Sequence, residues 1–252
     1  MKPRISLFII AKNEDAKIGK CIKSAKDLVS EIIVVDGNST DKTAQVAAAL
    51  GALVFKHSFE GFAGQKNFAL SKVSSPWALN LDADERLSPE LVRQIREVLP
   101  QTKHAGFEIN FSNFFLGKEM KHSGLNNERH IRLVRTEKAK YVGGLVHESL
   151  EVDGTIGHLS APIRHYSYEN IENYFRKLNK YTSLAAMQMY KSGRKFSILF
   201  VLVTIPFEFI KRYLFKLGFL DGMRGLIWAA FSAFYVFVKY IKLWFIEQSK
   251  EK

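Results

Sequence analysis

The sequence predicts an α/β fold: a mainly parallel sheet with an antiparallel extension, followed by amphipathic helices at the C-terminal end. Three observations lead to this expectation. Short apolar runs alternate with segments of helical spacing up to about residue 110, short extended pieces follow between residues 105 and 165, and the remainder has a helical pattern. Strands that alternate with helices form parallel sheets covered on both faces. We expect a sheet domain over residues 1–168 and a helical region over residues 169–252.

The elements of the parallel part follow one another in regular order. The expected strands are residues 5–11, 31–35, 52–55 and 77–81. The expected helices are residues 15–28, 42–50, 62–72 and 89–99. Pro89 suits the first turn of the last helix, and Ser88 is placed to cap it. The short strands of the antiparallel extension are expected at residues 106–111, 131–134 and 141–142.

Polar side chains follow three of these strands at the point where each strand ends. The segments are Lys12-Asn13-Glu14, Asp36 to Asp41, and Asp82-Ala83-Asp84. Open parallel sheets bind their ligands at the carboxyl ends of the strands. We therefore expect the three clusters to lie at one edge of the sheet and to form a binding site there.

Asp82 and Asp84 give the clearest chemical signal. Residues i and i+2 of an extended segment share a side, and two carboxylates there suit Mg²⁺ or Mn²⁺. A divalent ion would in turn neutralise a diphosphate. The alternative is a solvated acidic turn that caps the next helix. For Glu85, the third acid of the cluster, support of that turn is the simplest expectation.

Asp36 follows a continuous apolar strand and begins the segment "DGNSTDKT". Gly37 permits a tight turn, and Ser39 or Thr40 can cap the following helix. The segment is therefore a good β-to-α turn. Asp36 itself is not needed for capping and can accept hydrogen bonds from a ribose or a base. The chain contains neither G-x-G-x-x-G nor G-x-x-x-x-G-K-[ST], so neither a dinucleotide-binding Rossmann site nor a P-loop is supported.

Four segments carry a resemblance to a known family. "IIAKNE", "VVDGNSTDKT", "GQKNFAL" and "LNLDADE", in that order and spacing, resemble family 2 glycosyltransferases of the Rossmann-like GT-A fold over roughly residues 4–100. The later "IRLVR", "VHESL", "IRHYSY" and the aromatic tail look like the narrower group that contains lipopolysaccharide core β-1,4-glucosyltransferases. This resemblance implies an inverting, metal-dependent transfer of a hexose from a nucleotide-sugar, a UDP-sugar, to a lipopolysaccharide-core or other lipid-linked saccharide.

The resemblance also assigns roles to residues of this chain. It implies that Asn13 and Glu14 contact the nucleoside and that Asp36 lies near the uracil or ribose. It implies further that Lys66 and Asn67 lie near the nucleotide. Asp82 and Asp84 correspond to the family's D-x-D motif, which binds Mg²⁺ or Mn²⁺, and Asp84 is the more direct metal ligand.

An inverting transfer needs a carboxylate that takes the proton from the acceptor hydroxyl. Glu148, at the end of the Gly-led segment 143–148, matches the family's V-H-E element and is the expected base. Glu85 and Asp153 are alternatives. Glu148 could instead form a structural ion pair with Arg132 or Arg135.

Four further side chains have two interpretations each. His165 could complete the coordination of the metal, as a histidine downstream of the D-x-D does in some relatives, or be a hydrogen-bonded structural histidine. Arg132 and Arg135, with Arg129, could clamp a phosphate of the donor or of a phosphorylated acceptor. Their spacing of three residues is equally typical of a solvated basic face.

The C-terminal third is both basic and apolar. Residues 171–252 contain 14 Lys and Arg against 5 Asp and Glu, within a chain of net charge +12. Basic residues interleaved with apolar ones indicate a membrane surface, whereas nucleic-acid binding would favour a basic polar face. The apolar runs 196–207 and 226–238 are shorter than the roughly 20 residues that span a bilayer.

We therefore expect an interfacial or re-entrant helical hairpin, peripheral to the cytoplasmic face of the inner membrane. Homo-oligomerisation through the same helices is the alternative partner interaction, and we expect no nucleic-acid partner. Two other functions stay open. A polyprenyl-phosphate glycosyltransferase would transfer to an anionic acceptor and would not need Glu148 as a base. A non-catalytic membrane-binding scaffold would show no UDP-sugar hydrolysis with Mn²⁺.

Overall fold

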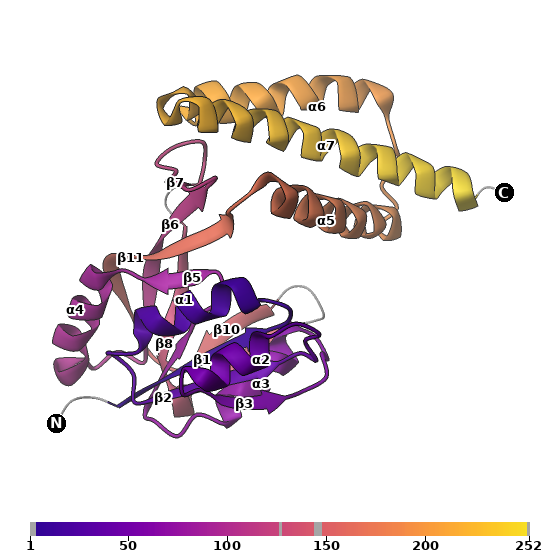
Figure 1. Ribbon diagram of the computed structural model, residues 1–252. Helices are drawn as coiled ribbons and strands as arrows, with labels where there is room; N and C mark the ends of the chain where they lie inside the picture. Colours follow the sequence, from indigo (N-terminus) through magenta and orange to yellow (C-terminus); the bar gives the residue numbers. More distant parts are fainter. Residues whose placement is uncertain (1–3, 126–127, 144–147, 251–252) are drawn as a thin grey trace. The chain divides into compact units, whose positions relative to one another are not determined.

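The computed structural model describes residues 4–125, 128–143 and 148–250 (Figure 1). The chain forms two compact units. The first comprises Met1–Phe111 and Glu128–His165, and the second comprises Ser112–Asn127 and Tyr166–Lys252. The second unit thus begins close to the expected boundary at residue 168, but it also includes residues 112–127, which the sequence analysis placed in the sheet domain.

The first unit is built on a mixed sheet in which four parallel strands are followed by antiparallel ones. The parallel part has the order β3-β2-β1-β4, and the order continues through β8, β6, β11 and β5. The parallel strands are β1 (Ile5–Ala11), β2 (Glu31–Asp36), β3 (Leu53–Lys56) and β4 (Trp77–Asn80). The others are β5 (Glu85–Leu87), β6 (Gly106–Phe115), β8 (Arg129–Arg135) and β11 (Ile156–Tyr168).

Helices cover this sheet, and a small ribbon lies beside it. The helices are α1 (Asp15–Ala25), α2 (Thr43–Ala49), α3 (Phe62–Ser71) and α4 (Pro89–Val98). β9 (Ala139–Gly143) and β10 (Glu148–Val152) form a separate antiparallel pair. The predicted α/β fold class, a parallel sheet with an antiparallel extension, is confirmed.

Both faces of the central strands are buried, as expected for a parallel sheet between helices. Leu7 and Ile9 of β1 join a core with Ile18 of α1 and Leu91 of α4. Phe8, which lies between them in the strand, points to the other core. Since successive side chains of a strand alternate between faces, the apolar run of β1 fills both cores.

Among the described residues, the structure contains four strands that the sequence analysis did not predict: β5, β7 (Lys118–Glu119), β10 and β11. Each contains Glu, Lys, Gly or Pro, residues that are depleted in strands. Partner strands decide their conformation instead. His165 of β11, for example, pairs in antiparallel register with Glu85 of β5.

Helix caps follow the prediction at one position and differ at another. Ser88 caps α4, since its Oγ accepts the Leu91 N–H at 3.1 Å. Neither Ser39 nor Thr40 caps α2. Asp41 lies closer to the helix start and accepts the Thr43 N–H at 2.9 Å instead.

The second unit is mainly helical. Its helices are α5 (Ile171–Lys191), α6 (Ile198–Ile210) and α7 (Met223–Lys250), with a π-helical turn Lys211–Phe215 and a 3-10 turn Gly218–Asp221 between the last two. Figure 1 shows α6 running alongside α7, and α5 packs against α7 as well. The expected 13-residue apolar run thus lies inside a 28-residue helix.

A hydrogen-bonded turn explains why residues 112–127 belong to this unit. They include the end of β6, which pairs with β7 (Lys118–Glu119). The buried carboxylate of Asp221 accepts the N–H groups of Lys121 and His122, both at 3.1 Å, and the Ser123 hydroxyl at 2.9 Å. Buried carboxylates are stable only when they are bonded in this way. Asp221 therefore ties this segment to the turn that precedes α7.

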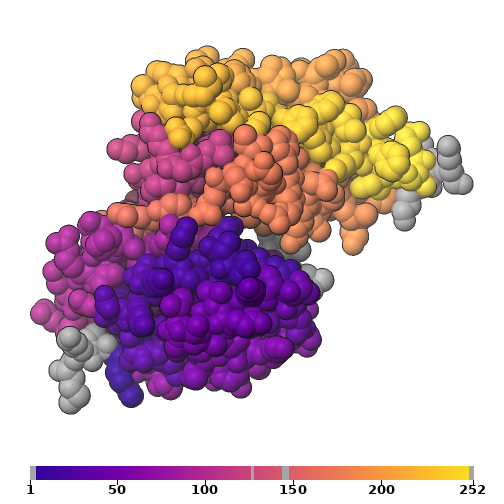
Figure 2. Space-filling model, in the orientation of Figure 1, coloured from indigo at the N-terminus to yellow at the C-terminus, as the bar shows by residue number. Residues whose placement is uncertain are grey.

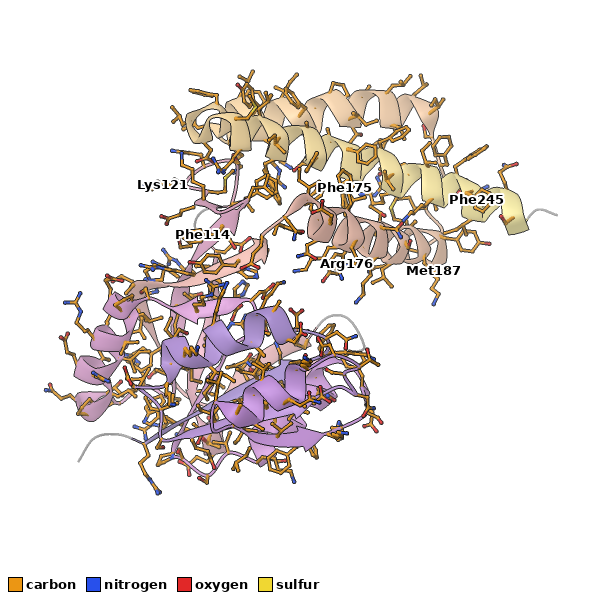
Figure 3. The ribbon with its side chains drawn as sticks, in the orientation of Figure 1. Phe114, Lys121, Phe175, Arg176, Met187 and Phe245 are labelled. Carbon is orange, nitrogen blue, oxygen red and sulfur yellow. The ribbon has the colours of Figure 1, made fainter. Side chains whose placement is uncertain are left out.

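Aromatic side chains fill the core between α5 and α7. Tyr174 stacks on Phe231 with ring centroids 4.6 Å apart, and Phe175 lies 5.2 Å from the same ring. Figure 3 shows Phe175 on the side of α5 that faces α7, whereas Met187 points away from that helix. Lys242 of α7 donates to the Asn179 carbonyl of α5 at 2.8 Å.

Candidate active site

The loops that follow β1 and β2 are tied together by Asn13. Its backbone is left-handed, with φ of 57°, a conformation that Asn tolerates better than most residues. Its side-chain oxygen accepts the Thr40 N–H at 2.8 Å, and its own N–H donates to Ser39 Oγ at 2.9 Å. Two strand ends are therefore joined into one rigid corner.

Asp36 lies within the same corner. It is 1% exposed, and its carboxylate accepts the Ser39 N–H at 3.1 and 3.3 Å. The N–H of Gly37 donates to the carbonyl of Ala11 at 2.8 Å. The structure thus brings Asp36 and Asn13 to one edge of the sheet, with Glu14 next in the chain.

Lys66 and Asn67 both lie on α3, but their partners differ. Asn67 donates to the Tyr141 carbonyl and accepts the Tyr141 N–H, at 2.8 and 2.9 Å. It therefore fixes β9 against α3 rather than presenting those atoms to a ligand. Lys66 is 6% exposed, and its Nζ lies 5.4 Å from the centre of the Tyr141 ring.

Arg132 is the cation at the end of β4. It is 9% exposed and reaches across from β8. Its guanidinium donates to Asn80 Oδ1 at 2.8 Å, to Asp82 Oδ2 at 3.1 Å and to Glu85 Oε1 at 2.5 Å. The guanidinium of an arginine has several donors and can be shared between two carboxylates in this way. Arg132 thus binds the protein's own carboxylates in this structure.

Glu85 has a larger role than the sequence analysis expected. It is 1% exposed, accepts the Asp82 N–H at 2.9 Å and shares Arg132 with Asp82. Burial, together with the negative charge of Asp82, raises the pKa of Glu85 to about 7, although Arg132 opposes this shift. Burial alone would also raise the pKa of Asp82, but Arg132 and Lys66 outweigh it and lower that pKa.

Asp84 points toward a different set of side chains. Its Oδ1 lies 3.5 Å from His165 Nε2, and its Oδ2 lies 4.0 Å from Lys17 Nζ, which is also 3.5 Å from Glu14. Burial would lower the pKa of His165, but the hydrogen bond and charge of Asp84 outweigh it and raise that pKa. His165 lies in β11, a strand that the sequence did not predict, and the pairing of this strand with β5 brings it to this position.

The metal expectation can be tested against this donor set. No group of three or more His, Cys, Asp and Glu is assembled for an ion within the described ranges. Asp84 and His165 nevertheless offer an oxygen and a nitrogen 3.5 Å apart. Mg²⁺ commonly takes one or two protein ligands and completes its shell with phosphate and water. The carboxylate of Asp84 fits such an ion, the imidazole of His165 favours Mn²⁺ over Mg²⁺ as its second protein ligand, and Asp82 is engaged by Arg132.

Glu148 is the first residue of β10 and forms an ion pair with Lys66. Its Oε1 lies 2.8 Å from Lys66 Nζ, so its partner is neither Arg132 nor Arg135. The preceding residues 144–147, which include His147 of the V-H-E element, lie outside the described residues. A cavity of about 430 Å³ opens beside the pair. Its lining consists of Lys66, Asp82, Glu108, Arg129, His130, Ile131, Arg132, Tyr141, Glu148 and Leu150.

Comparison with known proteins identifies the family of this chain. The family model described as glycosyl transferase family 2 matches residues 6–147, which is more than half of the chain. The chain belongs to glycosyltransferase family 2. The matched range includes the strand-end residues Asn13, Asp36, Asp82 and Asp84, and it ends one residue before Glu148.

Two relatives extend this similarity over nearly the whole glycosyltransferase. An uncharacterised glycosyltransferase of Rickettsia typhi is 34% identical over 95% of this chain and 86% of its own length. The lipopolysaccharide core biosynthesis glycosyltransferase LpsC of Rhizobium meliloti is 32% identical over 95% of this chain and 92% of its own. Among solved structures, S. aureus TarS 1–349 in complex with UDP-GlcNAc has a TM-score of 0.50 at 16% identity, covering 74% of this chain and 66% of TarS. This last similarity concerns the fold alone.

The structure separates Arg135 from Arg132, so these two arginines of the glycosyltransferase do not form the phosphate clamp that was one of their two interpretations. Arg135 pairs with Trp77 at the beginning of β4, whereas Asp82 follows the end of that strand. Its guanidinium lies 4.8 Å from the Trp77 ring and donates to the His104 carbonyl at 3.2 Å. Residues three apart in a strand point to opposite faces, so Arg132 and Arg135 cannot share one ligand.

Several site residues escaped the sequence analysis. Lys17 and Tyr141 carried no motif, and their positions depend on the tertiary structure. Asn80 did carry a signal, because a polar amide interrupts the apolar strand "WALNL". It is buried and accepts hydrogen bonds from Arg132 and from the Tyr141 hydroxyl, the latter at 3.3 Å. A buried amide in a strand needs partners, and here they are site residues.

Proposed function

We propose that this glycosyltransferase transfers a hexose from a UDP-sugar to a lipopolysaccharide-core or other lipid-linked saccharide, with inversion at the anomeric carbon. One observation carries this proposal: a carboxylate, Glu148, and two cations, Lys66 and Arg132, line a single cavity beside Asp82. A base and a cationic site for a leaving diphosphate are the two requirements of the reaction. The whole-length similarity to LpsC supports the class of acceptor.

The corner formed by Asn13 and Asp36 is the proposed nucleoside site. It lies at the carboxyl ends of β1 and β2, where sheets of this kind bind ligands. The hydrogen bonds between the two loops hold it in place before the donor arrives. A preorganised site avoids the entropy of ordering loops on binding.

The proposed reaction proceeds in one displacement. Glu148 accepts the proton of the acceptor hydroxyl as its oxygen forms a bond to the anomeric carbon of the donor sugar. The bond between that carbon and the diphosphate oxygen breaks on the opposite face, and UDP leaves with the electron pair. The positive charges of Lys66 and Arg132 lie on the side of Asp82, where they stabilise the departing anion.

A divalent ion would be held by Asp84 and His165, the oxygen and nitrogen donors that the structure brings together. When bound, it supplies charge neutralisation for the diphosphate. Asp82 is assigned a different task, because Arg132 lies 3.1 Å from its carboxylate. It positions Arg132 and contributes negative charge near the ion.

We also propose that the second unit binds a bilayer through α6. An exposed apolar stripe runs along this helix at spacings of three and four residues. It consists of Leu199, Leu202, Val203, Phe207 and Ile210, which are 40 to 73% exposed. Figure 2 shows α6 in orange and α7 in yellow at the surface of this unit. A continuous apolar face of this kind is typical of an interfacial helix.

The basic residues contribute less to this surface than the sequence suggested. Arg224 donates to the Leu116 carbonyl at 3.0 Å, Lys242 is bonded to α5, and Arg212 pairs with Glu208 at 2.8 Å. These cations stabilise the unit itself. α7, at residues Met223–Ser249, has the length and apolar composition of a membrane span, and 22% of its most apolar part is buried. Such a helix, taken alone, is weak support for a membrane location.

Transfer assays with the purified full-length protein test the proposed function. With UDP-hexose donors and a lipopolysaccharide-core acceptor, the wild-type protein is expected to form product, and Glu148→Gln to lose transfer. Full activity of Glu148→Gln on a polyprenyl phosphate would instead indicate an anionic acceptor that needs no base. A protein that neither transfers nor hydrolyses any UDP-sugar with Mn²⁺ would be a scaffold.

A further inference from the structure

Lys66 forms an ion pair with one carboxylate of the cavity, Glu148, and shares the cavity lining with a second, Asp82. Its Nζ is 2.8 Å from Glu148 Oε1, and its charge also acts on Asp82, which lines the same cavity. The side chains of Lys66 and Glu148 are 7% and 21% exposed. The charges of a pair that is this well shielded from water attract each other strongly, because solvent screens them little.

The two buried cations of the cavity, Lys66 and Arg132, differ in how tightly they are held. Arg132 donates to three side chains, those of Asn80, Asp82 and Glu85. Its planar guanidinium is therefore fixed. Lys66 has a flexible four-carbon stem, and its ammonium can turn to another anion without moving the backbone. Lys66 is the movable cation, and Arg132 is the stationary one.

The ion pair also opposes the proposed task of Glu148. A hydrogen bond from Lys66 occupies Oε1 of Glu148, one of the two oxygens of the carboxylate that would receive the proton of the acceptor hydroxyl. Release of that bond leaves both oxygens of Glu148 open to the acceptor. A diphosphate that arrives beside Asp82 carries more negative charge than Glu148 and competes for the same ammonium.

We propose that Lys66 is a positioning residue that couples donor binding to the release of Glu148. Before the donor binds, Lys66 holds Glu148. When the diphosphate of the donor enters, Lys66 turns to its oxygens, and Glu148 becomes available to the acceptor. This inference rests on the proposed function, and it predicts that the donor binds before the acceptor is activated.

Binding of UDP in the presence of MgCl₂ tests this coupling without any catalysis. If Glu148 competes with the diphosphate for Lys66, Glu148→Gln should bind UDP about three- to tenfold more tightly than the wild type. Glu151→Gln, on the same strand and exposed, is the matched control and should leave the Kd unchanged. Isothermal titration calorimetry on the full-length protein gives these constants.

A double-mutant cycle separates the proposal from simple charge repulsion. In a Lys66→Met background, Glu148→Gln should no longer tighten UDP binding. If it tightens binding equally in both backgrounds, or in neither, the coupling is wrong. Lys66→Gln repeats the cycle should Lys66→Met unfold, and Lys20→Met, an exposed lysine of α1, controls for net charge.

The same data distinguish failure of the coupling from failure of the proposed function. If the wild-type protein binds UDP but the double-mutant cycle gives no coupling energy between Lys66 and Glu148, the proposed coupling is wrong and the proposed function is unaffected. Wild-type protein that binds none of UDP, GDP, ADP and CDP overturns the nucleotide-sugar function and the coupling together. Tighter binding of UDP by Glu148→Gln only when Lys66 is present supports both.

Discussion

Arg132 and Glu85 form a buried ion pair, with 2.5 Å between the guanidinium and the carboxylate, at the end of β4. Glu85 comes directly after the D-x-D motif, and Arg132 comes from β8, 47 residues later. The pair holds the segment that carries Asp82 and Asp84, because Glu85 also accepts the Asp82 N–H. The D-x-D turn is thus fixed from its C-terminal side.

Removal of this arginine should be costly. Arg132→Met leaves Glu85 buried without its counter-ion, and breaking a buried pair in this way destabilises a protein by about 3–5 kcal/mol. Urea unfolding followed by circular dichroism measures the change. Arg129→Met, at a half-exposed arginine of the same strand, should change the stability by less than about 0.5 kcal/mol. Equal effects of the two substitutions would argue against the structural role of Arg132.

Glu148→Gln should reduce transfer to a hydroxyl acceptor by about 100- to 10,000-fold, the usual contribution of a general base. Because the amide keeps the shape of the side chain, folding and UDP binding should persist. Steady-state rates at saturating donor measure the loss. Glu151→Gln should retain the wild-type rate, and a Glu148→Gln enzyme that turns over normally would remove Glu148 from the mechanism.

Asp84→Asn should abolish the dependence of UDP binding on divalent ions. The substitution converts the carboxylate whose Oδ1 lies 3.5 Å from His165 Nε2 into a neutral amide, and an amide oxygen binds Mg²⁺ and Mn²⁺ more weakly than a carboxylate oxygen does. Calorimetric titration of UDP with and without MnCl₂ measures the difference. His165→Ala should reduce the ion's effect in the same direction. The exposed Asp27→Asn provides the control, and an undiminished ion effect in Asp84→Asn would exclude this site.

The exposed stripe of α6 should be required for membrane binding. Leu202→Glu combined with Val203→Glu places two charges at positions that are 61% and 69% exposed. Co-sedimentation with vesicles of anionic phospholipid should fall about tenfold or more, since charged residues are strongly disfavoured in the acyl region. Gln188→Glu, an exposed change on α5, should bind like the wild type.

The same double variant distinguishes membrane binding by the α6 stripe from association of that stripe with a second copy of the chain. Size-exclusion chromatography with light scattering should give one mass for the wild type and the variant in detergent. If the wild type is a dimer that the substitutions dissociate, and vesicle binding is unchanged, the α6 stripe is an oligomer interface instead.

The local sequence was sufficient for the parallel half of the fold. Residues 5–11 match β1, and the helices expected at residues 15–28 and 62–72 correspond to α1 and α3. The carboxyl-end positions of Asn13, Asp36, Asp82 and Asp84 followed from the same pattern. These features depend on hydrophobic periodicity and on turn residues, which neighbouring positions in the chain already contain.

The partners of the charged side chains came only from the tertiary structure. Lys66 and Glu148 are 82 residues apart, and Arg132 lies 50 residues beyond Asp82. No local pattern distinguishes Lys66 from Arg132 or Arg135 as the partner of Glu148. Strand pairing also decided that β11 brings His165 to Asp84. The sequence by itself therefore determined which chemical groups reach the edge of the sheet, and packing between distant segments decided which of them meet, because the pairing of buried charges depends on geometry.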